Sequence, residues 1–374
     1  MKPMLAFFQR PSGKTGLSAA LLVWALLALA CGRAGPTQVP PTVPVTNTAV
    51  APTPTLIPPT VTPLPTAAPT FTTTPVPVAT PAPAAPAGTR VLWRAGGVRG
   101  DEGSLFTELG GLDTDGERVY VADAYQGILV FDLEGNLLSV ISPGEIGYVF
   151  DVKVGPTGTI YMADKAFHQV SMFNRDGEPL GAFGGLGSGD GEFGPDSPRA
   201  LAVGPEGEVF VLDPNLNAEG RQVMRVQVFS AEGDFLRSFV IGPGYATQAM
   251  DVGPDDTLFV VSQEGYVAEL IPDNGMLIQK LGLESLRGAL PQAVGVDGAG
   301  NLYVTTQIPA AVAVLDRLGH FIEWLGEEGV RTDEGWPAGE FLFPFGVAVT
   351  ADGRYVFVAD TADVFAYVTA FERP

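Results

Sequence analysis

Charged residues stand at three positions where related parts of the chain carry small ones. Lys153 and Asp251 each come two residues before the residue that opens a glycine-containing turn, and Asp151 precedes Lys153 by two. The corresponding positions elsewhere are Gly111, Ala202, Gly295 and Ala348. A lysine near two carboxylates can bind a polar ligand or help to hold a cation. It can equally form an ion pair that only stabilises the fold, which is the simpler interpretation.

The sequence lacks the histidine and metal-binding patterns that are typical of catalytic sites. His168 and His320 are the only two histidines, and both fall in predicted loops or turns, where a lone histidine is most often a surface residue. The sequence has no zinc spacing, phosphate-binding glycine loop or nucleophile elbow. We therefore predict no cofactor, with one alternative. Three acidic residues could together hold Ca²⁺ through oxygen ligands, or form a solvated acidic loop: Asp190, Glu192 and Asp196.

The acidic residues are confined to one part of the chain. All 42 lie in residues 91–374, which hold 16 basic residues and therefore carry a formal net charge of −26. Such a surface repels nucleic acid and anionic headgroups, so we expect no nucleic-acid partner.

The first 31 residues follow the plan of an export signal. Basic residues precede an apolar run over 17–30, which is shorter than the roughly 20 residues that span a membrane. The run ends at Ala30-Cys31-Gly32, which resembles the lipidation site of bacterial lipoproteins. Cys31 is therefore the predicted lipidated residue, and a lipid anchor the predicted contact with the membrane. Ala28-Leu29-Ala30 also fits an ordinary signal peptidase, which would give a secreted protein.

Residues 32–89 consist almost entirely of Pro, Thr, Ala and Val. Proline at this density favours extended polyproline II, and a segment with so few charges and large side chains cannot bury enough surface to fold. We predict a disordered linker that holds the remaining domain, residues 90–374, away from the cell envelope.

From residue 108 onward one unit recurs six times. Each copy has an apolar strand, a glycine turn, a second strand, a third strand, a second glycine turn and a fourth strand. The second strands end at intervals of 41 to 54 residues, at Asp123, Asp164, Asp213, Ser262, Thr306 and Asp360. Units of this length with four short strands are typical of propeller blades. Residues 92–97 look like a separate fourth strand that would complete the last blade and close the ring.

The units resemble the NHL-repeat family. The motif Gly191-Glu192-Phe193, followed by Pro198 and a strand of small residues, recurs as Gly339-Glu340-Phe341 followed by Pro344. The resemblance covers residues 91–374 and implies an all-β, six-bladed β-propeller, here preceded by the disordered stalk. Blade four departs most from the pattern.

Loop variation indicates which end of the propeller carries function. The glycine turns are short and uniform, whereas the loops at the opposite end vary in length, and function usually lies in variable loops on a rigid scaffold. Aromatic residues near that end are candidate ligand anchors, or else pack between blades: Tyr125, Tyr148, Tyr245 and Trp336.

Two functions follow from these observations. The first is a surface-displayed, non-enzymatic module that recognises a protein, peptide or glycan at the variable-loop face. The second is a lactonase- or lyase-like enzyme that uses an Asp-bound cation at the channel mouth. Because the sequence lacks a catalytic set, we favour the first.

Overall fold

In a computed structural model of the chain, the described residues are 88–374 without 100–104, 142–146, 217–219, 221, 243–244, 263, 331 and 333–334. The predicted signal with Cys31, and the predicted linker up to residue 87, lie outside them. Within the described part, no helix has the length and apolar character needed to cross a membrane.

Six four-stranded antiparallel sheets make up the domain, and each is one blade of a β-propeller. Blade 1 contains β2 (Leu109–Thr114), β3 (Arg118–Asp123), β4 (Gly127–Asp132) and β5 (Leu137–Ile141). Blade 2 contains β6 (Val149–Val154), β7 (Ile160–Asp164), β8 (Gln169–Phe173) and β9 (Pro179–Gly184). Blade 3 contains β10 (Ala200–Val203), β11 (Val209–Leu216), β12 (Gln222–Phe229) and β13 (Phe235–Ile241).

The second half repeats this plan. Blade 4 contains β14 (Tyr245–Val252), β15 (Leu258–Ser262), β16 (Tyr266–Leu270) and β17 (Leu277–Leu281). Blade 5 contains β18 (Pro291–Val296), β19 (Leu302–Gln307), β20 (Ala310–Leu315) and β21 (Phe321–Leu325). Blade 6 contains β24 (Pro344–Val349), β25 (Tyr355–Ala362), β26 (Phe365–Glu372) and β1 (Arg90–Val98). A short parallel pair, β22 (Glu327–Glu328) and β23 (Glu340–Phe341), lies between blades 5 and 6 in the sequence.

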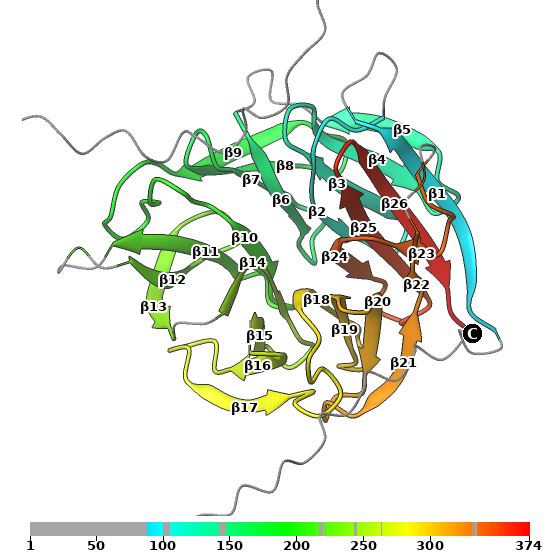
Figure 1. The fold of residues 1–374 in the computed structure, drawn as a ribbon. Helices are drawn as coiled ribbons and strands as arrows, with labels where there is room; N and C mark the ends of the chain where they lie inside the picture. The colour runs from blue at the N-terminus through cyan, green and yellow to red at the C-terminus, as the bar shows by residue number, and fades with distance from the viewer. Residues whose placement is uncertain are drawn as a thin grey trace, which may run out of the picture. The chain divides into compact units, whose positions relative to one another are not determined.

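The first strand of each blade lies innermost. Strands β2, β6, β10, β14, β18 and β24 contact one another in a closed ring around a central channel (Figure 1). We call the end at which these strands begin the cavity end, and the end at which they finish the turn end. The predicted six-bladed propeller is therefore confirmed.

The ring closes through the first and last strands of the domain. Strand β1 pairs antiparallel with β26 from Arg90↔Glu372 to Val98↔Phe365, so the N-terminal strand completes the last blade, as predicted (Figure 1). This pairing leaves no gap between the blade that begins the chain and the blade that ends it.

The core lies between neighbouring blades. One cluster joins Tyr120 and Val130 of blade 1 to Val152 and Met162 of blade 2, and similar clusters join the other blades. Side chains alternate between the two faces of each strand, and both faces of a blade are covered by neighbours. This explains why the second and third strands are buried along most of their length and mostly apolar, instead of alternating between buried and exposed residues.

Glycine is required where the outer hairpins turn. Gly135, between β4 and β5, has a φ of 88°, a conformation that residues with a Cβ rarely adopt. The Asp132 carboxylate stabilises the same turn by accepting the N–H groups of Glu134 and Asn136 at 3.1 and 2.7 Å. The repeated Asp/Asn-x-x-Gly pattern thus codes for the turn itself.

Candidate functional site

Six equivalent positions of the inner strands form a ring, which we call the lower ring. Each of them pairs with an aromatic residue of the second strand, as Lys153 does with Tyr161 and Asp251 with Phe259. In blade 1 the residue paired with the aromatic Tyr120 is Asp113. The members are Asp113, Lys153, Ala202, Asp251, Gly295 and Ala348.

The prediction that placed Gly111 in this ring was wrong by two residues. In blade 1 the turn glycine, Gly116, follows the last paired strand residue, Thr114, by two positions, whereas in blade 2 Gly158 follows Val154 by four. Counting back from the turn therefore misses the register in blade 1, and with it a third carboxylate in the channel.

Lys153 is held by the carboxylates around it. Its ammonium nitrogen lies 3.5 Å from Oδ1 of Asp251, and both side chains line a cavity of about 260 Å³ at the turn end, together with Asp113. Lys153 is 7% exposed, and Asp151 one pleat above it is 5% exposed. The structure therefore brings together Asp151, Lys153 and Asp251, which the sequence had singled out.

Each of the three carboxylates also joins two blades. The N–H groups of Val154, Leu201 and Val296 donate to Asp113, Asp151 and Asp251, at 2.7, 2.8 and 2.8 Å respectively. Each donor lies on the inner strand of the following blade. Hydrogen bonds of this kind satisfy backbone groups that face the channel and fix the spacing of the blades.

Burial changes the protonation of these groups. It raises the pKa of Asp113 to about 6 and that of Asp151 to about 7, although the Lys153 ammonium lowers both. Burial also lowers the pKa of Lys153, but the carboxylates, Asp251 foremost, raise it by more, so the lysine remains charged. The channel therefore contains a fixed cation and carboxyl groups that titrate close to neutral pH.

A second set of six positions, the upper ring, lies two residues before the lower ring. Five members are glycine or alanine, and the sixth is Asp151. They are Gly111, Asp151, Ala200, Ala249, Ala293 and Gly346. The small residues leave an open space, and Asp151 is the one charged side chain at this level.

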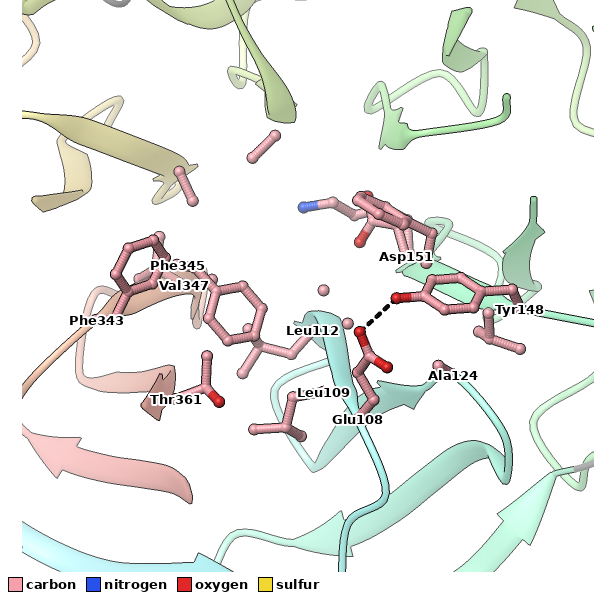
Figure 2. A pocket seen from close by; sticks show the side chains of 18 of the residues that line it. Glu108, Leu109, Leu112, Ala124, Tyr148, Asp151, Phe343, Phe345, Val347 and Thr361 are labelled. Atoms are coloured by element: carbon pink, nitrogen blue, oxygen red, sulfur yellow. Dashed lines mark hydrogen bonds between the residues drawn. The ribbon is translucent and has the colours of Figure 1, made fainter. Parts of the chain in front are cut away.

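That space is a cavity of about 240 Å³ at the cavity end of the channel. Aromatic and apolar side chains line its wall, with Tyr148 on one side and Phe343 and Phe345 on the other (Figure 2). Glu108, Arg99, Asp151 and Lys153 supply its charged groups. Apolar walls with a few polar groups are typical of ligand sites.

Buried aspartates at the ends of the second strands hold the rim of this cavity in place. Asp123 accepts the N–H of Glu108 at 3.2 Å, Asp164 accepts that of Tyr148 at 3.0 Å, and Asp360 accepts that of Phe343 at 2.6 Å. The three aspartates are fully or almost fully buried. The recurrent strand-ending Asp is therefore a structural device that positions the loops between blades.

Glu108 and Tyr148 form a side-chain hydrogen bond at the rim. The Tyr148 hydroxyl donates to Oε1 of Glu108 at 2.6 Å (Figure 2). Burial and this carboxylate raise the pKa of Tyr148 above its usual range, so the phenol keeps its proton and acts as the donor. The pair joins blade 1 to blade 2 across the cavity rim.

The predicted aromatic anchors separate into two groups. Tyr125 is 58% exposed and stacks edge-on against Tyr148, with 5.7 Å between ring centroids, beside the cavity. Trp336 is only 3% exposed and packs against Phe365 and Tyr367, so for this residue the structure favours the packing alternative over an exposed anchor. Its loop folds over blade 6, where burial of a large indole is worth more than contact with solvent. The side chain of Tyr245 lies outside the described part.

The predicted calcium ligands do not come together. Asp196 forms ion pairs with Lys165 and Arg199, and Glu192 accepts the N–H of Gly189 at 2.9 Å. Among the residues that the structure describes, no group of three His, Cys, Asp or Glu side chains could hold a metal ion.

The two histidines lie outside the cavity. The ring of His168 hydrogen-bonds the carbonyl oxygens of Gly194 and Ser197 at 3.1 and 3.2 Å. His320 pairs with Asp316 in an exposed turn at 2.9 Å. Each histidine therefore has a hydrogen-bond partner away from the cavity.

The sequence analysis missed Asp113, Glu108, Phe343 and Phe345. Once the register is known, Asp113 points to the same side of its strand as Lys153 does. The alternation of side chains along the strand could therefore have placed Asp113 on the channel. The other three lie in loops between blades or at the first residues of an inner strand. These three residues meet only because the ring of blades closes, and no pattern in the nearby sequence indicates that they do.

Comparisons with known proteins concern the fold. A selenomethionine-substituted virginiamycin B lyase from Staphylococcus aureus is 13% identical, with a TM-score of 0.50 over 76% of this chain and 100% of its own. A structural genomics protein of unknown function from Bacteroides thetaiotaomicron is 16% identical, with a TM-score of 0.55 over 76% of both chains. No protein-family model and no curated protein matches. The NHL relationship therefore stays a prediction, and what the chain shares with these structures is its fold.

Proposed function

We propose that the propeller is a non-enzymatic recognition module that binds a protein, peptide or glycan in the cavity at the mouth of its channel. One observation carries the proposal: an aromatic-walled cavity on a rigid ring, whose rim residues Glu108, Tyr148 and Phe343 are each held by a buried aspartate. A site that is already ordered loses little entropy when it binds a ligand.

The position of the N-terminal strand supports display at the cell surface. Arg90, where β1 begins, pairs with Glu372 at the turn end, whereas Arg99, just after β1 ends, lines the cavity. A chain that joins the domain at Arg90 therefore does so at the end opposite the cavity. With the predicted export signal and linker, this favours a tethered module whose cavity is free to meet a partner.

The test compares two phenylalanines of equal exposure. Phe343 at the cavity is 40% exposed, and Phe321 on the outer strand β21 is 39% exposed. The immobilised full chain is screened against peptide and glycan arrays, and the binders are repeated with Phe343→Ala and Phe321→Ala. We expect specific binders that Phe343→Ala weakens at least about tenfold and Phe321→Ala leaves unchanged. Arrays without binders, or binders indifferent to Phe343→Ala, would refute the proposal.

A second candidate function is a lactonase- or lyase-like reaction in the same cavity. One observation favours it, because the pKa of Asp151, which burial raises to about 7, suits a general base. Against it, both Asp151 oxygens already accept backbone N–H groups, from Val152 and Leu201. Turnover of lactone substrates that Asp151→Asn abolishes would establish this function, and its absence would remove it.

A further inference from the structure

The formal charges along the channel do not balance. At the cavity Glu108 and Asp151 match Arg99 and Lys153, but the cavity at the turn end adds Asp113 and Asp251, so the channel as a whole holds four formal negative charges and two positive ones. The excess lies in a buried setting where charges interact strongly. The domain as a whole adds to this effect, because residues 91–374 carry a formal net charge of −26.

The two basic groups are already engaged. Lys153 forms its ion pair with Asp251, and the Arg99 guanidinium donates to the backbone carbonyl of Asp363. Glu108 and Asp151, by contrast, form no salt bridge with any of the described residues. Their carboxylates have further lone pairs beyond the hydrogen bonds that they accept. Because Lys153 is shared among Asp113, Asp151 and Asp251, the net formal charge of the channel stays negative.

The aromatic wall of the cavity favours a ligand that carries an apolar chain next to a cationic group. Tyr148, Phe150, Phe343 and Phe345 contribute aromatic rings from blades 2 and 6. Aromatic faces attract ammonium and guanidinium groups and pack well against alkyl chains. At about 240 Å³ the cavity is smaller than the roughly 300–1,000 Å³ of sites for drug-sized ligands, which suits one side chain or a short amine.

We infer that the cavity selects an organic cation on an alkyl chain, with the head group near Glu108 and Asp151 and the chain against the aromatic rings. This inference rests on the proposed recognition function and narrows its ligand. A lysine or arginine side chain of a polypeptide has this chemistry, and so does a free alkylamine. A neutral or acidic glycan does not.

Calorimetric titration of the full chain at low ionic strength and pH 8 tests the inference. The probes are the N-acetyl methylamides of lysine, arginine, norleucine and glutamate, together with n-butylammonium. We expect the lysine or arginine derivative, or n-butylammonium, to bind at least about tenfold more tightly than the norleucine derivative. Binding of n-butylammonium with similar affinity would identify the free cation as sufficient. Binding of the capped amino acids alone would identify a polypeptide side chain.

Isosteric variants assign the effect to the two carboxylates. Glu108→Gln and Asp151→Asn each keep a hydrogen-bond acceptor but remove a charge, and each should weaken cation binding about fivefold or more. Glu232→Gln, in an exposed turn at the opposite end, is the matched control and should change nothing. Equal affinity for the lysine and norleucine derivatives, or for wild type and Glu108→Gln, would overturn the inference.

Failure of the inference can be told apart from failure of the proposed function. If the norleucine or glutamate derivative binds best and Phe343→Ala abolishes that binding, the cavity is a recognition site for a different ligand class. If no probe and no array member binds in a way that depends on Phe343, the recognition function itself fails.

Discussion

Gly111 and Asp151 share one place in the channel, because a Cβ on Gly111 would overlap Oδ1 of Asp151. Glycine in blade 1 therefore makes room for the carboxylate of blade 2, which in turn accepts the N–H of Leu201 in blade 3 at 2.8 Å. The contacts between blades 1, 2 and 3 at this level therefore require a residue without a side chain at position 111.

The first prediction follows from this relationship. Gly111→Ala should displace the Asp151 carboxylate, break its bond to Leu201 and lower the free energy of unfolding by about 1–3 kcal/mol. Urea denaturation measures this loss. Gly97→Ala is the control, because no atom lies within 4 Å of the Cβ it would add. Equal stability of the two variants would show that the carboxylate can move freely.

Asp164 should contribute strongly to stability, although it does not line the cavity. It accepts four N–H groups, from Gly147, Tyr148, Ala166 and Phe167, at 2.9 to 3.1 Å. Asp164→Ala leaves these donors without their partner and should cost about 2–4 kcal/mol of stability. Hydrogen exchange should accelerate at Tyr148 and Phe167 before it does so in β7. Unchanged exchange at Tyr148 would contradict the role assigned to the strand-ending aspartates.

Stability should fall as the pH rises from about 4 to about 7. Burial raises the pKa of Asp113 to about 6 and of Asp151 to about 7, so the folded chain holds protons that the unfolded chain has released. Each group contributes a slope of up to about 1.4 kcal/mol per pH unit. Asp113→Asn should flatten the curve of unfolding free energy against pH, whereas Asp176→Asn, in an exposed turn, should not. Parallel curves for wild type and Asp113→Asn would be inconsistent with a buried, titrating Asp113.

Removal of the channel cation should produce a pH-dependent defect. Lys153→Met leaves Asp113, Asp151 and Asp251 without their counter-ion, and at pH 8 it should cost about 3–5 kcal/mol. At pH 5 the loss should be smaller, because Asp113 and Asp151, whose pKa values burial raises to about 6 and about 7, are then largely protonated. The surface variant Lys280→Met should show no such dependence in thermal or urea unfolding. A constant loss across this range would indicate that only packing is lost.

Trp93 should be critical for ring closure. Its indole N–H donates to the carbonyl oxygen of Leu133 at 2.8 Å, and its ring lies about 6 Å from those of Phe131 and Phe357. Trp93→Ala should cost about 3–5 kcal/mol, and Trp93→Phe should recover much of the packing but not the hydrogen bond. Trp324→Ala, on the outer strand β21, should cost less. Calorimetry or urea unfolding measures all three variants.

The repeated units could be predicted from the sequence because each turn and strand is specified by the few residues that form it. Turn glycines such as Gly135 and strand ends such as Asp123 recur at regular spacing, which gave six blades and the pairing of β1 with β26. Strand alternation also placed Lys153 and Asp251 on the channel. In blade 1 the same count failed at Asp113, because the turn glycine Gly116 follows the last paired strand residue by two positions there instead of four.

The cavity could not be predicted in the same way. Glu108 and Tyr148 are 40 residues apart, and their contact depends on how neighbouring blades are spaced. Phe343 faces them across the channel only because the ring closes (Figure 2). The burial of Trp336 depends on a loop that packs on its own blade, which no residue spacing reveals.

The pairing of β1 with β26 also determines how the domain would carry a mechanical load. A pull applied at Arg90 and resisted by a ligand at the opposite end would act along β1, at right angles to the hydrogen bonds of its eight register pairs with β26. In that direction the hydrogen bonds of the ladder are sheared together and share the force, instead of being broken one at a time. The strand that closes the ring is therefore also oriented to withstand tension between Arg90 and a ligand bound in the cavity.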